Sequence, residues 1–246
     1  MNHGVTLDID GGIATLLLTA SARRNALTVA MAQAMIDACE MIDANPAVGA
    51  VIVHGEGYFC AGADRELLQA AGSDPADPRH FDTLGLIYES FARVGRLAPP
   101  TIAAVVGGAV GAGLNLALAT SLRVVAQDAT LLSGFLPIGL HPGGGHTALL
   151  MRAAGQETAH ALALFGERLS GVEAARRGLA WAAVPAAEVL PTARRLAAVP
   201  AADPALARRT AASLRATSGP PALPASAALE LERAAQMWSL RRRELS

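Results

Sequence analysis

Apolar residues recur along the first two thirds of the chain in two alternating patterns. Residues 50–54 and 101–106 form short, continuous apolar runs, which are typical of strands buried on both faces. Residues 29–43 instead carry apolar side chains three and four positions apart, and Thr28 before them is a good N-cap. This alternation predicts an α/β protein in which helical crossovers connect the strands of a parallel sheet.

The same patterns predict the other elements. A hairpin is expected from residues 5–9 and 13–18 around Asp10-Gly11-Gly12. Further strands are predicted at 123–126 and near 130–133. Helices are predicted at 81–97, at 111–120, directly after residues 142–146, near 156–164 and at 171–178. The polar stretch 72–78 is expected to be a mobile loop.

Residues from about 186 onward are helix-rich and are interrupted by prolines. We expect these prolines to break the helices, and they are Pro191, Pro200, Pro204, Pro220, Pro221 and Pro224. The chain is therefore divided into a predicted core over residues 1–190 and a predicted C-terminal helical region, used for oligomerisation, over residues 191–246.

Composition narrows the classes of function. The 246 residues are 52% hydrophobic and 17% charged, which is enough for a large core, and the net charge of −1 argues against nucleic-acid or anionic-membrane partners. Glycines and prolines interrupt every long apolar stretch, and the N-terminus does not resemble a secretory signal. With only two cysteines, we expect a cytoplasmic protein without a disulfide framework.

All 20 basic residues are arginines. Schiff-base or lysine-base chemistry is therefore excluded, and phosphate recognition has to use arginine, backbone N–H or hydroxyl groups. The six histidines are scattered without metal-ligand spacing, so no metal site is predicted.

Two loops rich in glycine and alanine, 59–64 and 107–113, each follow a predicted strand and open a predicted helix. Such turns leave backbone N–H groups without partners, and a helix N-terminus adds partial positive charge. Two converging loops would form an oxyanion hole, the device that stabilises an enolate or a tetrahedral oxyanion. The alternative for either loop alone is a tight turn that needs glycine for its geometry.

Four motifs stand in the order and spacing of one family. They are Arg-Asn-Ala-Leu at 24–27, Phe-Cys-Ala-Gly-Ala-Asp at 59–64, Gly-Ala-Gly-Leu at 111–114 and Gly-Leu-His-Pro-Gly-Gly-Gly at 139–145. Across residues 5–185 the chain resembles the crotonase (enoyl-CoA hydratase/isomerase) superfamily. The resemblance implies a crotonase-like spiral of ββα units that assembles as a homotrimer or as a hexamer, a dimer of trimers. It also implies an acyl-CoA thioester as substrate or ligand, no separate cofactor, and an oxyanion hole formed by the N–H groups of Ala63 and Ala112.

The resemblance also assigns contacts to coenzyme A. They fall on Arg24, Ala26, Ala61, Ala63, Asp64, Arg65, Gly111 and Ala112. The Ala61 carbonyl would meet the adenine and Arg65 would lie near the phosphates, whereas a solvated surface role is the alternative for Arg24 and Arg65. Acyl contacts are expected from Leu67, Leu68, Phe81 and Leu84.

The chain departs from the family at the two glutamates that position and activate water in its hydratases. Asn115 and Phe135 stand at those positions. An amide does not exchange a proton near neutral pH and a phenyl ring has no polar atom, so ordinary hydration is expected to be nearly abolished. Asn115 can still orient a carbonyl or a water, or it is simply a satisfied buried amide.

Several residues are candidates for a relocated acid or base. His141 is the first of them and His146 the second, since both flank the triple-glycine turn, and helix capping or a satisfied turn is the alternative for each. Glu66 and Glu89 are further candidates, whereas Asp64 is expected mainly to fix its loop. Ser133 has no obvious base and is expected to be structural, and the Cys60 side chain is expected to point into the core.

The arginines of the C-terminal segment have two alternative roles. Arg241, Arg242 and Arg243 could meet the phosphates of coenzyme A or form a solvated helix end. Two functions follow from the sequence: an enzyme that acts on acyl-CoA by isomerisation, thioester hydrolysis or C–C cleavage, and a non-catalytic acyl-CoA-binding protein on the same scaffold. A structural homo-oligomer without a ligand is a third.

Overall fold

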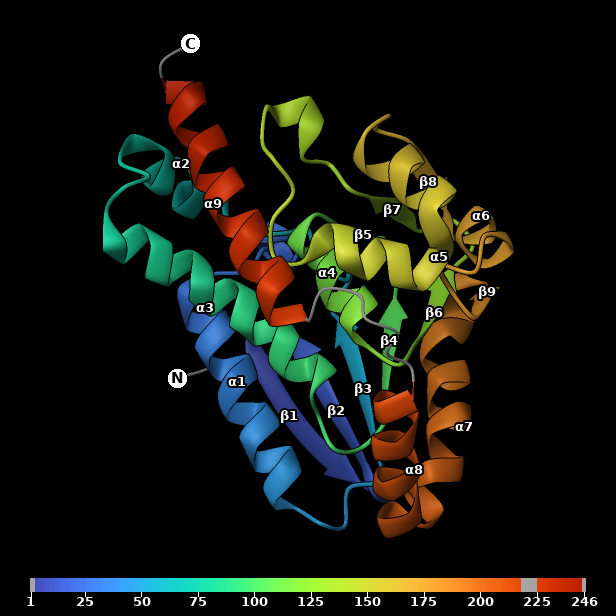
Figure 1. Cartoon of the computed structure of the whole chain (residues 1–246). Coiled ribbons are helices and arrows are strands. Elements are labelled where there is room, and N and C mark those ends of the chain that lie inside the picture. The colour runs from blue at the N-terminus through green and yellow to red at the C-terminus, as the bar shows by residue number, and fades with distance from the viewer. Residues whose placement is uncertain (1–2, 218–224, 245–246) are drawn as a thin grey trace.

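The computed structural model describes residues 3–217 and 225–244, and its strands form two sheets (Figure 1). The larger sheet has the order β1 (Val5–Asp10), β2 (Ile13–Leu18), β3 (Ala50–Gly55), β4 (Thr101–Val105), β6 (Leu122–Ala126) and β9 (Ala182–Val184). It is parallel from β2 onward, and β1 pairs with β2 as the predicted antiparallel hairpin. The smaller sheet joins β5 (Gly108–Val110), β7 (Thr130–Leu132) and β8 (Arg168–Ser170).

Helices connect and cover these strands. In chain order they are α1 (Val29–Ala44), α2 (Arg65–Ser73), α3 (Pro78–Gly95), α4 (Ala112–Ala119), α5 (His146–Ala163), α6 (Gly171–Arg176), α7 (Val189–Ala202), α8 (Pro204–Thr217) and α9 (Ala225–Glu244). Short 3₁₀ turns among the described residues are η1 (Ser21–Arg23), η2 (Leu136–Ile138) and η3 (Ala186–Glu188). The predicted α/β class is therefore confirmed.

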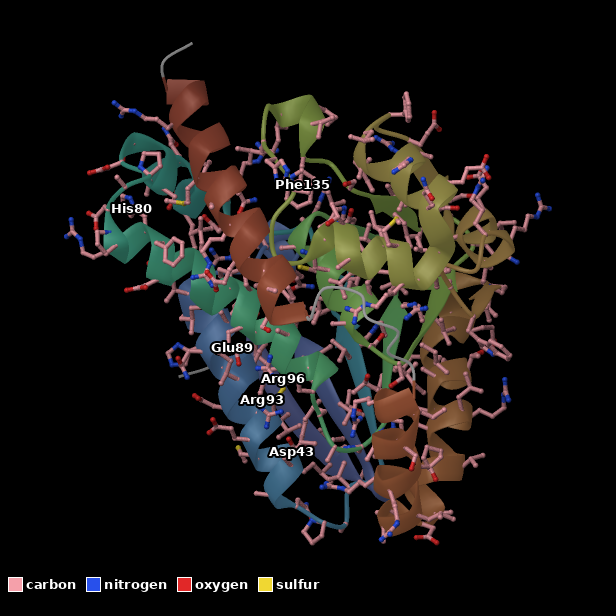
Figure 2. All side chains as sticks on the ribbon, viewed as in Figure 1. Asp43, His80, Glu89, Arg93, Arg96 and Phe135 are labelled. Atoms are coloured by element: carbon pink, nitrogen blue, oxygen red, sulfur yellow. The ribbon has the colours of Figure 1, made fainter. Side chains whose placement is uncertain are left out.

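The α1 helix forms as its sequence predicts. The Thr28 side chain accepts a hydrogen bond from the Met31 amide at 3.2 Å, and the apolar face of the helix, with Met31, Met35 and Ile42, is buried. This helix packs on β1, β2 and α3. Figure 2 shows Asp43 of α1 facing Arg93 of α3, and the Oδ2 and Nη2 atoms of this pair are 2.7 Å apart.

Several predicted boundaries are wrong, for identifiable reasons. The loop predicted over 107–113 contains β5, because Gly108–Val110 pairs with β7. By contrast, the two helices predicted after residue 145 and near 156–164 are both present, joined as α5 across a kink at Gly155, whose φ is +74°. The helix predicted at 81–97 begins at Pro78 because Asp77 caps it. The strands β8 and β9 were not predicted, since each has only three residues.

The prolines of the C-terminal part act differently from expectation. Pro191 lies in the first turn of α7, where a missing amide costs nothing, and Pro200 lies near the end of the same helix without breaking it. Pro204 does separate two helices, because α8 begins there. Pro220, Pro221 and Pro224 lie outside the described residues.

The C-terminal helices pack on the rest of the chain. The α7 helix lies on β2, β3, β4 and β6, and the predicted division at residues 190 and 191 falls inside it. The α9 helix lies against α2 and α3 (Figure 1). None of the described helices is long and apolar enough to cross a membrane.

Candidate functional site

The first two sequence motifs are held together by backbone hydrogen bonds. The Ala61 amide donates to the Arg24 carbonyl at 2.9 Å, and the Leu27 amide donates to the Gly62 carbonyl at 2.7 Å. The Asp64 amide returns a bond to the Leu27 carbonyl at 3.0 Å. The structure thus brings together most of the residues predicted to bind coenzyme A from these two motifs.

This pairing fixes the direction of the Ala63 amide. The Gly62 carbonyl and the Asp64 amide both face Leu27, as in a parallel bridge. Because neighbouring peptide units of an extended segment point to opposite sides, the N–H of Ala63 faces away from Leu27. Ala63 itself is partly exposed.

The second loop packs against the first, backbone to backbone. The Cys60 amide donates to the Gly108 carbonyl at 3.2 Å, and the Val110 amide donates to the Cys60 carbonyl at 3.1 Å. A Cβ atom on Gly62 would lie 2.9 Å from the Val110 carbonyl oxygen and 3.7 Å from the Ala112 nitrogen. Glycine is needed at this position because the two loops meet there, not only because a turn favours it.

The Ala112 amide lies at the start of α4. Gly111, with a φ of +55°, precedes the helix, and Ala112 is its first residue. The first amides of a helix have no acceptor within the helix and carry its partial positive charge. The Ala112 amide, the second of the two predicted to form the oxyanion hole, therefore lies within a few ångströms of the loop that contains Gly62.

The buried side chains of Asn115, His146 and Ser133 form a chain of hydrogen bonds that begins in the first turn of α4. The Asn115 Nδ2 donates to the Gly143 carbonyl at 2.9 Å, and its Oδ1 lies 2.6 Å from the Nδ1 of His146. The Nε2 of His146 lies 2.6 Å from the Oγ of Ser133. All three side chains are at most 1% exposed.

The bonding partners of these side chains determine which atom donates and which accepts in each hydrogen bond. Because the Gly143 carbonyl only accepts, the Asn115 amide nitrogen faces it, and Oδ1 is left to accept the Nδ1–H of His146. The Nε2 lone pair of His146 then accepts the hydroxyl proton of Ser133. Burial lowers the pKa of His146 to about 3, which keeps the imidazole neutral near pH 7.

Phe135 lies beside this chain. Its ring meets that of His146 edge-on, with 5.0 Å between the centroids, and one of its carbons lies 3.7 Å from a Cβ position on Gly111. Of the two positions at which the resemblance predicts the glutamates of hydratases, position 135 is therefore apolar, and at the other the amide oxygen and nitrogen of Asn115 are engaged with the protein.

Ser133, expected to have no obvious base, has an imidazole within hydrogen-bonding distance of its hydroxyl. Its partner His146 is 13 residues away in sequence and comes from a different element, the start of α5. The only signal in the sequence was a histidine directly after the three glycines, where a helix begins.

The other candidate acids and bases lie elsewhere. The Nδ1 of His141 bonds to the Pro142 carbonyl at 2.7 Å, and the His141 carbonyl accepts from Gln236 of α9. Glu66 is exposed in the first turn of α2. Glu89 pairs with Arg96 on the surface of α3 (Figure 2).

The loop residues around Cys60 have structural partners. Asp64 caps α2 by accepting from the Glu66 amide at 3.0 Å, which confirms its predicted role in the loop. Cys60 is fully buried, its Sγ donates to the Asn25 carbonyl, and burial raises the pKa of its thiol to about 12. The guanidinium of Arg24 lies 5.7 Å from the centre of the Tyr58 ring, and Arg65 is exposed.

Two cavities flank α2. One, of about 620 Å³, lies between the turn after α2 and the α9 helix, and Arg241 lines it together with Met237. The other, of about 330 Å³, is lined by residues of α1, α2 and α3 that include Leu67 and His80. Of the remaining predicted acyl contacts, Leu84 is buried in the core and Phe81 lies under Arg233, 4.1 Å from its guanidinium carbon. Nothing is described of the Arg242 and Arg243 side chains.

Known proteins are similar to this chain over most of its length. A profile described as enoyl-CoA hydratase/isomerase matches residues 8–243. The probable enoyl-CoA hydratase EchA14 of Mycobacterium tuberculosis is 42% identical over 221 residues, which cover 89% of this chain and 84% of that protein. The 1,2-epoxyphenylacetyl-CoA isomerase of Escherichia coli is 33% identical over 77% of this chain and 72% of its own length. The crystal structure of an enoyl-CoA hydratase from Mycobacterium avium subsp. paratuberculosis superposes with a TM-score of 0.83 at 28% identity, covering 97% of this chain and 94% of that one.

Proposed function

The chain belongs to the enoyl-CoA hydratase/isomerase family of the crotonase superfamily, and on that premise we propose that it binds acyl-CoA thioesters without carrying out ordinary hydration. The amides of Ala63 and Ala112 would hold the thioester oxygen. The observation that supports this proposal best is the contact between the two loops at Gly62, which brings the Val110 carbonyl and the Ala112 amide against the first loop.

The two amides suit a thioester carbonyl for a physical reason. Both are backbone groups on elements fixed by hydrogen bonds, so they need little rearrangement when negative charge develops on the oxygen. The start of α4 adds its partial positive charge to the same place. A ligand whose carbonyl becomes an enolate or a tetrahedral oxyanion gains most from such a site.

The loss of hydration follows from the groups beside the hole. Hydration of an enoyl-CoA requires a base for the attacking water and an acid for the α carbon. Asn115 has both amide atoms engaged, by Gly143 and by His146, and Phe135 offers no polar atom. Neither side chain is therefore available to move a proton between water and substrate.

A non-catalytic binding protein is the second candidate. Both amide atoms of Asn115 are hydrogen-bonded within the protein, which favours a non-catalytic role. A protein that no longer transfers protons can still bind the thioester carbonyl. The exposed residues Arg24 and Arg65 would contact the phosphates of coenzyme A in either case.

We also propose that copies of this chain associate as a homotrimer or a hexamer. Large apolar side chains are exposed near η2 and at the end of α5, among them Ile138 at 48% and Phe165 at 78%. A Cβ atom on Gly166 would touch Pro137, so these two segments adjoin. Light scattering of the wild type and of Phe165→Glu tests this proposal, and a monomeric wild type would contradict it.

The proposed function is tested by titrating the full chain with crotonyl-CoA. The heat of binding and the formation of the hydrated product, 3-hydroxybutyryl-CoA, are followed on the same samples. Saturable binding at micromolar concentration with no hydrated product is the expected result. The absence of binding would overturn the proposal, and rapid formation of 3-hydroxybutyryl-CoA would overturn its claim about hydration.

A further inference from the structure

The Ser133–His146–Asn115 chain has the polarity of an activated nucleophile. In hydrolases that use serine or cysteine, an imidazole accepts the nucleophile's proton on one nitrogen while an acceptor holds the N–H of the other. The same order occurs here, with 2.6 Å between Ser133 Oγ and His146 Nε2 and 2.6 Å between His146 Nδ1 and Asn115 Oδ1. Asn115 is fixed in turn by its bond to Gly143.

This hydroxyl belongs to a residue that lies beside the candidate oxyanion hole. The Gly111 amide donates to the Leu132 carbonyl at 3.1 Å, and Val110 pairs with Leu132 in the small sheet. A Cβ atom on Gly111 would lie 3.7 Å from the Ser133 carbonyl oxygen. Ser133 therefore comes directly after Leu132, the strand partner of Val110. It also adjoins Gly111, the residue before Ala112.

We propose that Ser133 is a catalytic nucleophile that hydrolyses the acyl-CoA thioester bound at the Ala63 and Ala112 amides, with His146 as its base and Asn115 as the residue that positions His146. This inference rests on the proposed function, because it needs the thioester carbonyl in that hole. It gives the chain an activity that requires neither of the missing glutamates.

The reaction balances with water as the only co-substrate. The Ser133 Oγ forms a bond to the thioester carbon while His146 Nε2 takes the hydroxyl proton, and the two amides hold the oxyanion. The C–S bond then breaks, and the coenzyme A thiolate takes the proton from His146. Water next attacks the Ser133 ester and gives its proton to His146. The carboxylic acid leaves, and Ser133 recovers its proton.

A saturated ester, hexanoyl-CoA, separates this reaction from the other chemistry of the family. It has no double bond to hydrate or to shift, so release of free thiol reports hydrolysis alone. The thiol is followed with a disulfide dye. The protein itself contributes little background, because burial raises the pKa of both its thiols, Cys39 and Cys60, to about 12.

The expected result is thiol release by the wild type that falls at least about a hundredfold in Ser133→Ala, and similarly in His146→Gln. Ser90→Ala is the matched control, because Ser90 is another fully buried serine, bonded only to the Ile87 carbonyl of its own helix among its described partners. Its rate should equal that of the wild type. Asn115→Ala should lower the turnover number more than it changes KM, since Asn115 acts through His146.

Acid quenching during turnover should trap an acyl group on the protein, and digestion should map it to the peptide that contains Ser133. This measurement needs no variant, so it decides the question even where a substitution prevents folding. Binding of hexanoyl-CoA without thiol release, undiminished release by Ser133→Ala, or an acyl group on another residue would overturn the inference. Failure to bind hexanoyl-CoA at all would instead overturn the proposed function.

Discussion

The Nδ1 of His146 lies 2.6 Å from the Oδ1 of Asn115, and this contact couples the start of α5 to the first turn of α4. By its resemblance to the hydratases of the family, the chain has Asn115 where a glutamate is expected to act on water. The Asn115 side chain contacts a histidine that burial keeps neutral. On the proposed function, the two loops would hold the thioester carbonyl, with a hydrogen-bonded amide and imidazole beside them in place of that glutamate.

The first prediction concerns Asn115→Asp. A carboxylate next to the imidazole favours its charged form, so the pKa of His146 should rise by more than about one unit, as measured by NMR titration. The Gly143 carbonyl loses its donor, which should lower the free energy of unfolding by about 1–3 kcal/mol. An unchanged His146 pKa would show that the two side chains are not in contact in solution.

The second prediction concerns stability at low pH. His146 has a pKa of about 3 in the folded chain and about 6.5 when unfolded, so only the unfolded state takes up this proton between these values. Its contribution to stability is complete above about pH 6.5 and is lost as the pH falls toward 3, by about 1.4 kcal/mol per pH unit.

Urea unfolding at several pH values measures this dependence. His146→Gln is the control, because it removes the titrating group and leaves the other histidines in place. The difference in slope between the two proteins isolates His146. Equal slopes for the wild type and the variant would contradict a buried, neutral imidazole.

The third prediction compares two glycines of similar conformation. Gly62 and Gly57 both have positive φ, +106° and +68°, so alanine is strained at each. A Cβ on Gly57 meets nothing within 4 Å, whereas one on Gly62 would press on the Val110 carbonyl at 2.9 Å. Gly62→Ala should therefore weaken acyl-CoA binding by at least about tenfold by separating the loops, and Gly57→Ala should leave the affinity unchanged. Calorimetric titration of both variants decides it, and equal affinities would argue against the loop contact as the ligand site.

The fourth prediction concerns the end of α1. The guanidinium of Arg208, from α8, donates to the carbonyls of Val48, Asp43, Ile42 and Asn45. A lysine is a single point charge and cannot reproduce this fork, so Arg208→Lys should cost about 2 kcal/mol of unfolding free energy. Arg209→Lys is the matched control, because Arg209 is exposed, and it should change the stability by less than about 0.5 kcal/mol. An equal effect of both substitutions on the urea midpoint would contradict this role for Arg208.

Most elements and the two glycine-rich loops could be predicted from the sequence because their signals are local. Thr28 and the apolar spacing after it define α1, and the two glycine-rich loops follow buried strands. The chain from Ser133 to Asn115 could not be predicted, because it joins three elements through side-chain distances that only the fold sets. Short strands such as β8 were missed for a similar reason, since pairing with β7 rather than local pattern defines them.

The role of α9 also depends on tertiary contacts. Its sequence suggested either a phosphate contact or a solvated end, whereas the helix packs on α2 and α3 through groups such as Arg233, whose guanidinium stacks on the Phe81 ring. Arg241 remains a candidate for the phosphates of coenzyme A, because it is exposed and lines the larger cavity.

The most direct test of the account uses the Ser133→Ala variant, which cannot consume the ligand, and compares the Kd of crotonyl-CoA with that of the matched thioether, in which a methylene group replaces the carbonyl. Two backbone hydrogen bonds of about 1 kcal/mol each predict that the thioester binds about 30-fold more tightly. Equal dissociation constants for the two ligands would show that no pair of amides holds the carbonyl oxygen, and would contradict the account.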